Sequence, residues 1–342
     1  MTQIYTAFTL FISLLVEAIP FLLLGVLLSS VFPLFFEEGN LINKIPNHPI
    51  VGAIVGSLFG FFFPVCECGN IPVARRLLLQ GLPISVAISF LLAAPTLNPV
   101  VIWSTYVAFR GQPEVFWLRI IFSLIIAISL GCIFSVQKDI RPFLRPLLAK
   151  RLTAIMEAKQ CHLKTVNPIA EYSLLQSGSF LLSSGGKTIK IDETLLPSKP
   201  ILKSKLPLQS RWHLFVNNVY NEFRELGGVL ILGSAVASGI QVFVPRDIIL
   251  NLGQDSVTSI LAMMILAAVI SICSTVDSFF ILSFSSTFTT ASIVAFLVFG
   301  PMIDIKALGL MLSIFRPRML TYMMIIIAQL TFVLTLGYSY LF

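Results

Sequence analysis

The stretch Pro64-Val-Cys-Glu-Cys-Gly-Asn-Ile-Pro72 lies inside an otherwise apolar region of this chain. Its nine residues include two thiols, a carboxylate, an amide, a glycine and two prolines, where a lipid-facing segment would carry Leu and Phe. Buried polar groups are costly in a bilayer, and backbone that leaves the helix there must line a cavity or pack against protein. The stretch therefore predicts a membrane helix that is broken and lined with polar groups, which is typical of a passage through the membrane.

The composition of the whole chain agrees with that prediction. Of its 342 residues, 56% are hydrophobic and 11% are charged, and the mean hydropathy is +0.93. A transmembrane helix needs roughly 20 residues, so the chain has room for about eight spans and one large loop. We expect an all-α integral membrane protein, in which the first apolar run stays as a helix and is not removed as a signal peptide.

A polar region over residues 137–211 separates a first transmembrane half (1–136) from a second one (212–342). This region holds 13 Lys/Arg and 5 Asp/Glu residues, whereas the rest of the chain is nearly neutral. Because basic loops stay in the cytoplasm, we expect this loop there, and four spans per half would bring both termini to the same side of the plasma (inner) membrane. The loop is expected to meet the lipid surface or a partner protein and not nucleic acid. A small β-hairpin is expected within it at Gly185-Gly186.

The two halves look like copies of each other. The residues that match at offsets of 206 to 208 are Glu17 with Glu225, Gly25 with Gly233, Cys66 with Cys273, Phe90-Leu91 with Phe296-Leu297, Pro95 with Pro301 and Asn98 with Asp304. Internal repeats are common in transporters, and four helix breaks at similar distances from their turns should meet near the bilayer midplane. We expect eight full spans in two four-helix halves, and we expect Glu17 and Glu225 to cap free N–H groups. If the broken segments are re-entrant hairpins instead, each half has an odd number of crossings and the repeat is inverted.

The thiols of Cys66 and Cys68 are the first candidate for a substrate-binding site. Thiolates bind soft species such as Zn(II), Cu(I), trivalent arsenic and persulfides. Two thiols are too few for a closed structural zinc site, so no resident metal is expected. Because Glu67 and Asn70 accompany the thiols, we prefer substrate binding to two alternatives, namely small residues that let helices pack closely and a redox pair.

The segment from Pro95 to Pro99 is the second candidate. Its two prolines bracket Thr96 and Asn98 and free backbone carbonyls at the expected depth of the break. These two side chains either line the passage or are satisfied by the backbone at a simple kink. We include both in the candidate substrate site.

The second half contributes the third candidate. Cys273, Ser274 and Asp304 lie at its expected breaks, and intramembrane carboxylates are by default functional. For Asp304, an ion pair with Lys306 is the structural alternative. Asp277 has no obvious local partner, so it is the candidate for proton coupling.

The run Pro64-x-Cys-x-Cys-Gly-x-Ile-Pro72, followed by Leu78-x-x-Gly81 and by Ser89-Phe-Leu-x-x-x-Pro95-x-x-Asn98-Pro, resembles the ArsP/YraQ-type predicted permeases. The resemblance covers nearly the whole chain, although Ala295-Phe-Leu-x-x-Gly-Pro301 fits it more loosely. It implies about eight spans in two similar halves. Some members export trivalent organoarsenicals, which implies soft-thiol chemistry at the matching cysteines. This chain departs from the family in its long basic loop and in Glu67, which shifts the preference toward a metal cation.

These observations favour an inner-membrane permease that moves a small solute, an organoarsenical or a metal ion, by proton-coupled alternating access, in the manner of an efflux protein. The sequence has no phosphate loop, nucleophile elbow or zinc-protease motif, so we expect neither an enzyme nor a cofactor. The alternative is a membrane thiol-redox protein that uses Cys66 and Cys68. A third interpretation is a channel-like subunit that needs a soluble partner on the basic loop.

Overall fold

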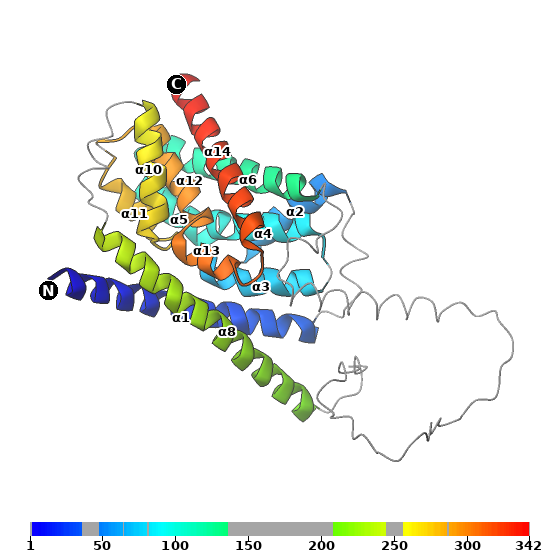
Figure 1. The fold of residues 1–342 in the computed structure, drawn as a ribbon. Coiled ribbons are helices and arrows are strands. Elements are labelled where there is room, and N and C mark those ends of the chain that lie inside the picture. The colour runs from blue at the N-terminus through cyan, green and yellow to red at the C-terminus, as the bar shows by residue number, and fades with distance from the viewer. Residues whose placement is uncertain are drawn as a thin grey trace, which may run out of the picture.

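The computed structural model describes residues 2–35, 48–63, 65–80, 82–135, 208–243, 256–285 and 287–341 (Figure 1). The regular elements of these ranges are all α-helices, which confirms the predicted all-α fold class. They are α1 (Thr2–Phe35), α2 (Pro49–Phe62), α3 (Glu67–Leu79), α4 (Ile84–Leu97), α5 (Pro99–Ala108), α6 (Pro113–Ser135), α8 (Leu208–Phe243), α10 (Ser256–Ile270), α11 (Asp277–Leu282), α12 (Thr290–Met302), α13 (Ile305–Met311) and α14 (Pro317–Leu341).

Six helical segments of the described part are long and apolar enough to cross a membrane. They are 4–31, 84–108, 113–135, 215–242, 290–311 and 317–341. The α2 and α10 helices are apolar but shorter. The protein is therefore a multi-pass membrane protein, in which six of the eight predicted apolar segments have the length of a full span.

The segment that was expected as the second span folds back on itself. Glycines 52 and 60 of α2 lie against the beginning and the end of α4, respectively, so α2 and α4 are parallel. Asn70, at the start of α3, donates a hydrogen bond to the carbonyl of Leu91, in the middle of α4 (2.8 Å). Because α3 ends just before α4 begins, α3 is antiparallel to α4 and hence to α2. The α2–α3 pair is a re-entrant hairpin.

The corresponding segment of the second half has the same arrangement. The hydroxyl groups of Ser259 and Ser292 lie 2.7 Å apart near the starts of α10 and α12, and Ala267 lies against Gly300 near their ends. These two helices are therefore parallel. Phe280 of α11 stacks on α12 before the chain turns into that helix, so α11 is antiparallel to α12. The α10–α11 pair is the second hairpin.

The long helices define two ends of the bundle. Ser29, near the end of α1, donates a hydrogen bond to Glu222, in the first half of α8 (3.1 Å). The two helices run in roughly opposite directions and pack against each other where they cross (Figure 1). Tyr338, near the end of α14, donates to Glu114 at the start of α6 (2.8 Å). One end of the bundle is the end at which α6 stops and α8 begins, and we call it the loop end. The opposite end, where α1 begins and α14 stops, is the terminus end.

The sequence analysis preferred four spans per half and left re-entrant hairpins as the alternative. The described helices have the geometry of that alternative, with three long apolar segments and one hairpin per half. Along the bundle, α1 begins and α14 stops at the end opposite to the flanks of the loop. The α2–α3 hairpin starts from the loop end, and the α10–α11 hairpin starts from the terminus end.

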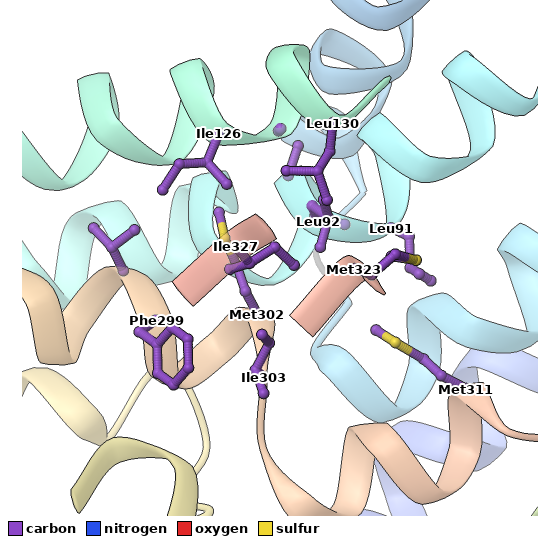
Figure 2. Packing of buried hydrophobic residues seen from close by; sticks show 14 of the residues in the cluster. Leu91, Leu92, Ile126, Leu130, Phe299, Met302, Ile303, Met311, Met323 and Ile327 are labelled. Carbon is purple, nitrogen blue, oxygen red and sulfur yellow. The ribbon is translucent and has the colours of Figure 1, made fainter. Parts of the chain in front are cut away.

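The four helices α4, α6, α12 and α14 form the centre of the packed interior. Figure 2 shows side chains from both halves meeting there, among them Leu92, Ile126, Met302 and Ile327. Membrane helices associate through close packing, and small residues let their backbones approach. A Cβ atom on Gly25 of α1 would lie 2.3 Å from the carbonyl oxygen of Gly69 in α3. That contact holds α1 tightly over the start of α3.

Two predictions concern residues outside the described ranges. These are most of the basic loop over 137–211 and its β-hairpin at Gly185-Gly186, and both stay predictions. Within the described residues, α8 already begins at Leu208, a few residues before the predicted start of the second half.

Candidate functional site

The motif of the first half lies at the start of α3. Cys66 is the N-cap with extended backbone (φ −74°, ψ 177°), and its carbonyl accepts hydrogen bonds from the amides of Gly69 and Asn70 (both 3.1 Å). Glu67 stands in the first turn, where the helix dipole favours a negative charge. Pro72 lacks an N–H group, so the carbonyl of Cys68 loses its helical donor. The start of α3 is therefore a polar site with free backbone acceptors.

All the polar side chains of this motif are buried. Cys66, Glu67, Cys68 and Asn70 are between 1% and 8% exposed, and the two thiols lie close to each other. This burial is a consequence of the hairpin, because α1 packs on one face of α3 and α4 on another. The four predicted residues of this motif are thus neighbours in the fold and are shielded from lipid.

The start of α13, in the second half, faces the start of α3. Asp304 is its N-cap and accepts a hydrogen bond from the amide of Ala307 (2.6 Å). Lys306 follows in the first turn and is 2% exposed. Its positive charge interacts with the charges of Asp304 and Glu67, and α13 packs against α3. We call Cys66, Glu67, Cys68, Asp304 and Lys306 the thiol–carboxylate cluster.

The residue that follows α10 contacts the start of α13 at this cluster. Ser271 has a left-handed backbone (φ 48°) directly after α10, which is uncommon for a residue with a side chain. Its hydroxyl accepts a hydrogen bond from the amide of Ile305 (3.3 Å) and contacts Asp304. The strained residue therefore connects the break after α10 with the break before α13.

Cys273, in the same break after α10, lies near the cluster. Cys273 is 5% exposed and lies within electrostatic range of Glu67 and Cys66. Ser274 is 1% exposed, and its carbonyl accepts a hydrogen bond from Arg119 of α6 (3.5 Å). The structure thus brings six of the predicted residues, from both halves, to one region. These are Cys66, Glu67, Cys68, Asn70, Cys273 and Asp304.

Several oxygen atoms of this region have no hydrogen-bond partner in the described part of the chain. They are Oε2 of Glu67, Oδ2 of Asp304 and Oδ1 of Asn70. Buried polar atoms are nearly always paired in proteins, so unpaired ones indicate a place for a bound species. Within the described ranges, no group of three or more His, Cys, Asp and Glu side chains is arranged to hold a metal ion.

Asp277 lies in a second buried cluster. It forms an ion pair with Arg119 of α6 (3.0 Å), and both side chains are at most 3% exposed. Arg119 also donates to the hydroxyl groups of Thr105 and Ser278 (2.8 Å each). We call Thr105, Arg119, Asp277 and Ser278 the arginine–aspartate cluster. Asp277 thus has a partner, which the sequence analysis could not see because it lies 158 residues away.

Arg119 is the functional-looking residue that the sequence analysis missed. Eight full spans would place it near the outer surface, but it is 1% exposed inside the bundle. An arginine one and a half turns into an apolar helix is the signal that could have identified it, because intramembrane charges pair with one another.

The structure places Thr96 and Asn98 in local backbone contacts. The hydroxyl of Thr96 donates to the carbonyls of Leu92 and Ala93 (3.1 and 3.2 Å). Oδ1 of Asn98 accepts from the amide of Val100 (2.9 Å) and so caps α5. These bonds are those of the simple-kink alternative.

The two matched glutamates lie in helix interiors and not at helix starts. Glu225 accepts a hydrogen bond from Arg75 of α3 (3.0 Å), and its side chain is 48% exposed. The expected capping role is therefore wrong for Glu225, because an arginine takes the place of backbone N–H groups. Glu17 is within electrostatic range of Lys306.

Two proteins with assigned names are similar to this chain over most of its length. Over 93% of this chain and 93% of the relative, it is 35% identical to "UPF0718 protein YcgR" of Bacillus subtilis (strain 168). It is 32% identical to a "Putative two-component membrane permease complex subunit" of Streptococcus mutans serotype c (strain ATCC 700610 / UA159), over 93% of this chain and 89% of that protein. No solved structure matches the chain. The family model ArsP_1, described as "Predicted permease", matches residues 3–340, so the chain belongs to this permease family.

Proposed function

We propose that this protein is a permease, not an enzyme, and that it moves a small thiol-binding solute by alternating access. The observation that carries the proposal is the thiol–carboxylate cluster. Two thiols and a carboxylate from a helix break of one half meet a carboxylate from a break of the other half, all buried. Transporters place their sites between halves, at broken helices, because movement of one half against the other then opens the site to either side.

The donor atoms define the solute class. Thiol sulfur atoms bind soft species, and the unpaired oxygens of Glu67, Asp304 and Asn70 are all acceptors. Acceptors require a cation or a hydroxyl-bearing solute. A soft metal ion such as Zn(II) and a hydroxylated trivalent organoarsenical both satisfy these requirements. We propose one of these two as the substrate and export as the direction.

We interpret the two halves as inverted repeats and the loop end as cytoplasmic. The helix starts and stops at the loop end carry Arg75, Arg76, Arg316 and Arg318, next to the basic loop. Positive residues prefer the cytoplasmic side of the inner membrane. Four spans per half would have put Arg316 and Arg318 on the outer side, whereas three crossings bring them to the side of the loop. Both termini then face outward.

Proton coupling remains assigned to Asp277 in this proposal. Arg119 neutralises the Asp277 carboxylate in the closed cluster, so a proton would be taken up when the pair opens during the transport cycle. Carboxylates in membrane segments commonly carry protons in transporters.

A second candidate is that the chain is one subunit of a permease complex. The Streptococcus mutans relative carries the words "two-component membrane permease complex subunit" in its name, and the basic loop offers a surface for an acidic partner. Flux through the single chain in liposomes would argue for the first candidate. Flux that appears only after a second protein is added would argue for the subunit.

The deciding experiment is flux of methylarsenite, Zn(II) and Cu(I) into proteoliposomes. We expect one of these solutes to be transported by the wild type and not by the Cys66→Ser/Cys68→Ser variant, because the soft ligands are lost. The control is Cys132→Ser, which removes a half-buried free thiol of α6. Thiol-independent flux would refute the assigned site. No flux together with a reversible Cys66–Cys68 disulfide would support the redox alternative.

A further inference from the structure

Lys306 is a lysine in the interior of a membrane protein. It is 2% exposed, and α8 packs closely over it, because a Cβ atom on Gly233 would lie 3.6 Å from the Cα of Lys306. Lysine is almost never fully buried unless it is paired, and in membrane segments it marks functional sites. The position therefore needs an explanation beyond packing.

Negative groups face Lys306 from three elements. They are Asp304 at the start of its own helix, Glu67 and Cys68 of α3, and Glu17 of α1. Both halves of the molecule thus contribute to the electrostatic environment of this ammonium group. The lysine offsets the charge that the cluster would otherwise hold without compensation.

Lys306 nevertheless forms no ion pair with a described residue. Within the described ranges, the pairs with N–O distances of 4.0 Å or less are Arg75–Glu225 and Arg119–Asp277. One oxygen each of Glu67 and Asp304 stays without a partner. Lysine is a point charge on a flexible stem, whereas arginine binds carboxylates through a fixed fork. The carboxylates are therefore compensated in charge but remain open to another ligand.

We propose that the Lys306 ammonium group is a tethered cation that competes with a cationic substrate for Glu67 and Asp304. In the empty site it supplies the positive charge. No three of these ligands are arranged around one point in the described conformation, so binding of a soft cation has to draw the thiols and the two carboxylates together. Like-charge repulsion then drives the ammonium group away. After release it returns, so the empty site can change conformation without two uncompensated carboxylates. This inference rests on the proposed function and names a charge-selective residue for it.

The test is a Cd(II) titration of the purified full-length protein in detergent, followed by the ultraviolet absorption of the cadmium–thiolate bond. Lys306→Gln removes the charge, so we expect Cd(II) to bind at least about tenfold more tightly than to the wild type. Lys306→Arg keeps the charge and should leave the affinity near that of the wild type. Lys306→Met, which fills a similar volume, serves if the glutamine variant does not fold.

Two outcomes overturn the inference. One is an affinity of the Lys306→Gln or Lys306→Met variant that equals or falls below that of the wild type. The other is a tighter signal that survives Cys66→Ser in the same chain, because Cd(II) would then bind elsewhere. Thiol-dependent flux without a tightened affinity would refute only the role of Lys306. A tightened affinity without flux of any soft solute would keep that role and refute the permease proposal.

Discussion

The thiol–carboxylate cluster and the arginine–aspartate cluster occupy matching places in the two halves. The first joins α3 to α13, and the second joins α11 to α5. By chain position, Asn70 of the first half corresponds to Asp277 of the second. Asn98 likewise corresponds to Asp304, and each of these two residues caps a helix. In the first cluster, one oxygen each of Glu67 and Asp304 has no hydrogen-bond partner, so we call it the open cluster. In the second, Arg119 and Asp277 form a hydrogen-bonded ion pair, so we call it the closed cluster.

The surroundings of the two clusters differ as well. The long helices α1 and α8 pack against α3 and α13 and cover the first cluster. Near the second cluster, α5 and α11 expose large apolar side chains, such as Trp103 (67%) and Phe279 (48%). The first cluster is thus covered and keeps unpaired acceptor atoms, as our proposed substrate site requires, while the second connects the two halves through an ion pair.

The largest expected effect comes from breaking the closed cluster. Asp277→Ala leaves the Arg119 charge buried without compensation, which costs about 3–5 kcal/mol of stability. Thermal unfolding in detergent measures this loss. The Arg119→Met/Asp277→Ala variant should recover most of it. Glu67→Gln in the open cluster should change stability much less, and equal losses at both places would contradict the comparison.

A smaller effect is expected at the helix that covers the open cluster. Gly25→Ala places a methyl group against the backbone of Gly69, and such overpacking typically costs about 1–3 kcal/mol. Because α1 must then move away from α3, we also expect weaker Cd(II) binding. Gly227→Ala is the matched control, since no atom lies within 4 Å of its added methyl group. Unchanged stability and binding of the Gly25 variant would contradict this prediction, because α1 could then move away from α3 without a measurable cost in free energy.

The smallest effect is expected at the ion pair near the loop end, where the Arg75 side chain is 7% exposed and the Glu225 side chain 48%. Arg75→Gln removes this pair but leaves a neutral side chain in the buried position and the Glu225 carboxylate partly in water. Pairs that water reaches contribute about 0–1 kcal/mol and are screened by salt. Unfolding temperatures at low and high ionic strength measure this term. A loss as large as that of Asp277→Ala would mean that both ion pairs carry the contact between the halves.

Much of the fold could be predicted from the sequence. Long apolar runs require helices in a bilayer, and the polar stretch from Pro64 to Pro72 requires a break, because proline and unpaired polar groups do not fit a lipid-facing helix. The positions of the four breaks followed from the same reasoning. For the same reason, Glu67 and the two thiols could be recognised as a candidate site.

The choice between a full span and a helical hairpin could not be made from the sequence. A run of about 30 apolar residues has the composition of a full span whether it crosses or folds back at its break. The choice depends on which surfaces α2 and α3 find on α4, such as the glycine contacts of α2 and the bond from Asn70. These contacts join residues far apart in the sequence, and no local pattern encodes them.

The sequence by itself thus determined an all-helical membrane protein with broken helices and a buried thiol motif, because the bilayer imposes these features on each segment separately. Tertiary structure alone decided the re-entrant hairpins, the pairing of Asp277 with Arg119, and the placement of Lys306 beside Glu67. Charges in a low-dielectric interior act on whatever partner the fold brings near. For both charged groups that partner belongs to the other half of the chain.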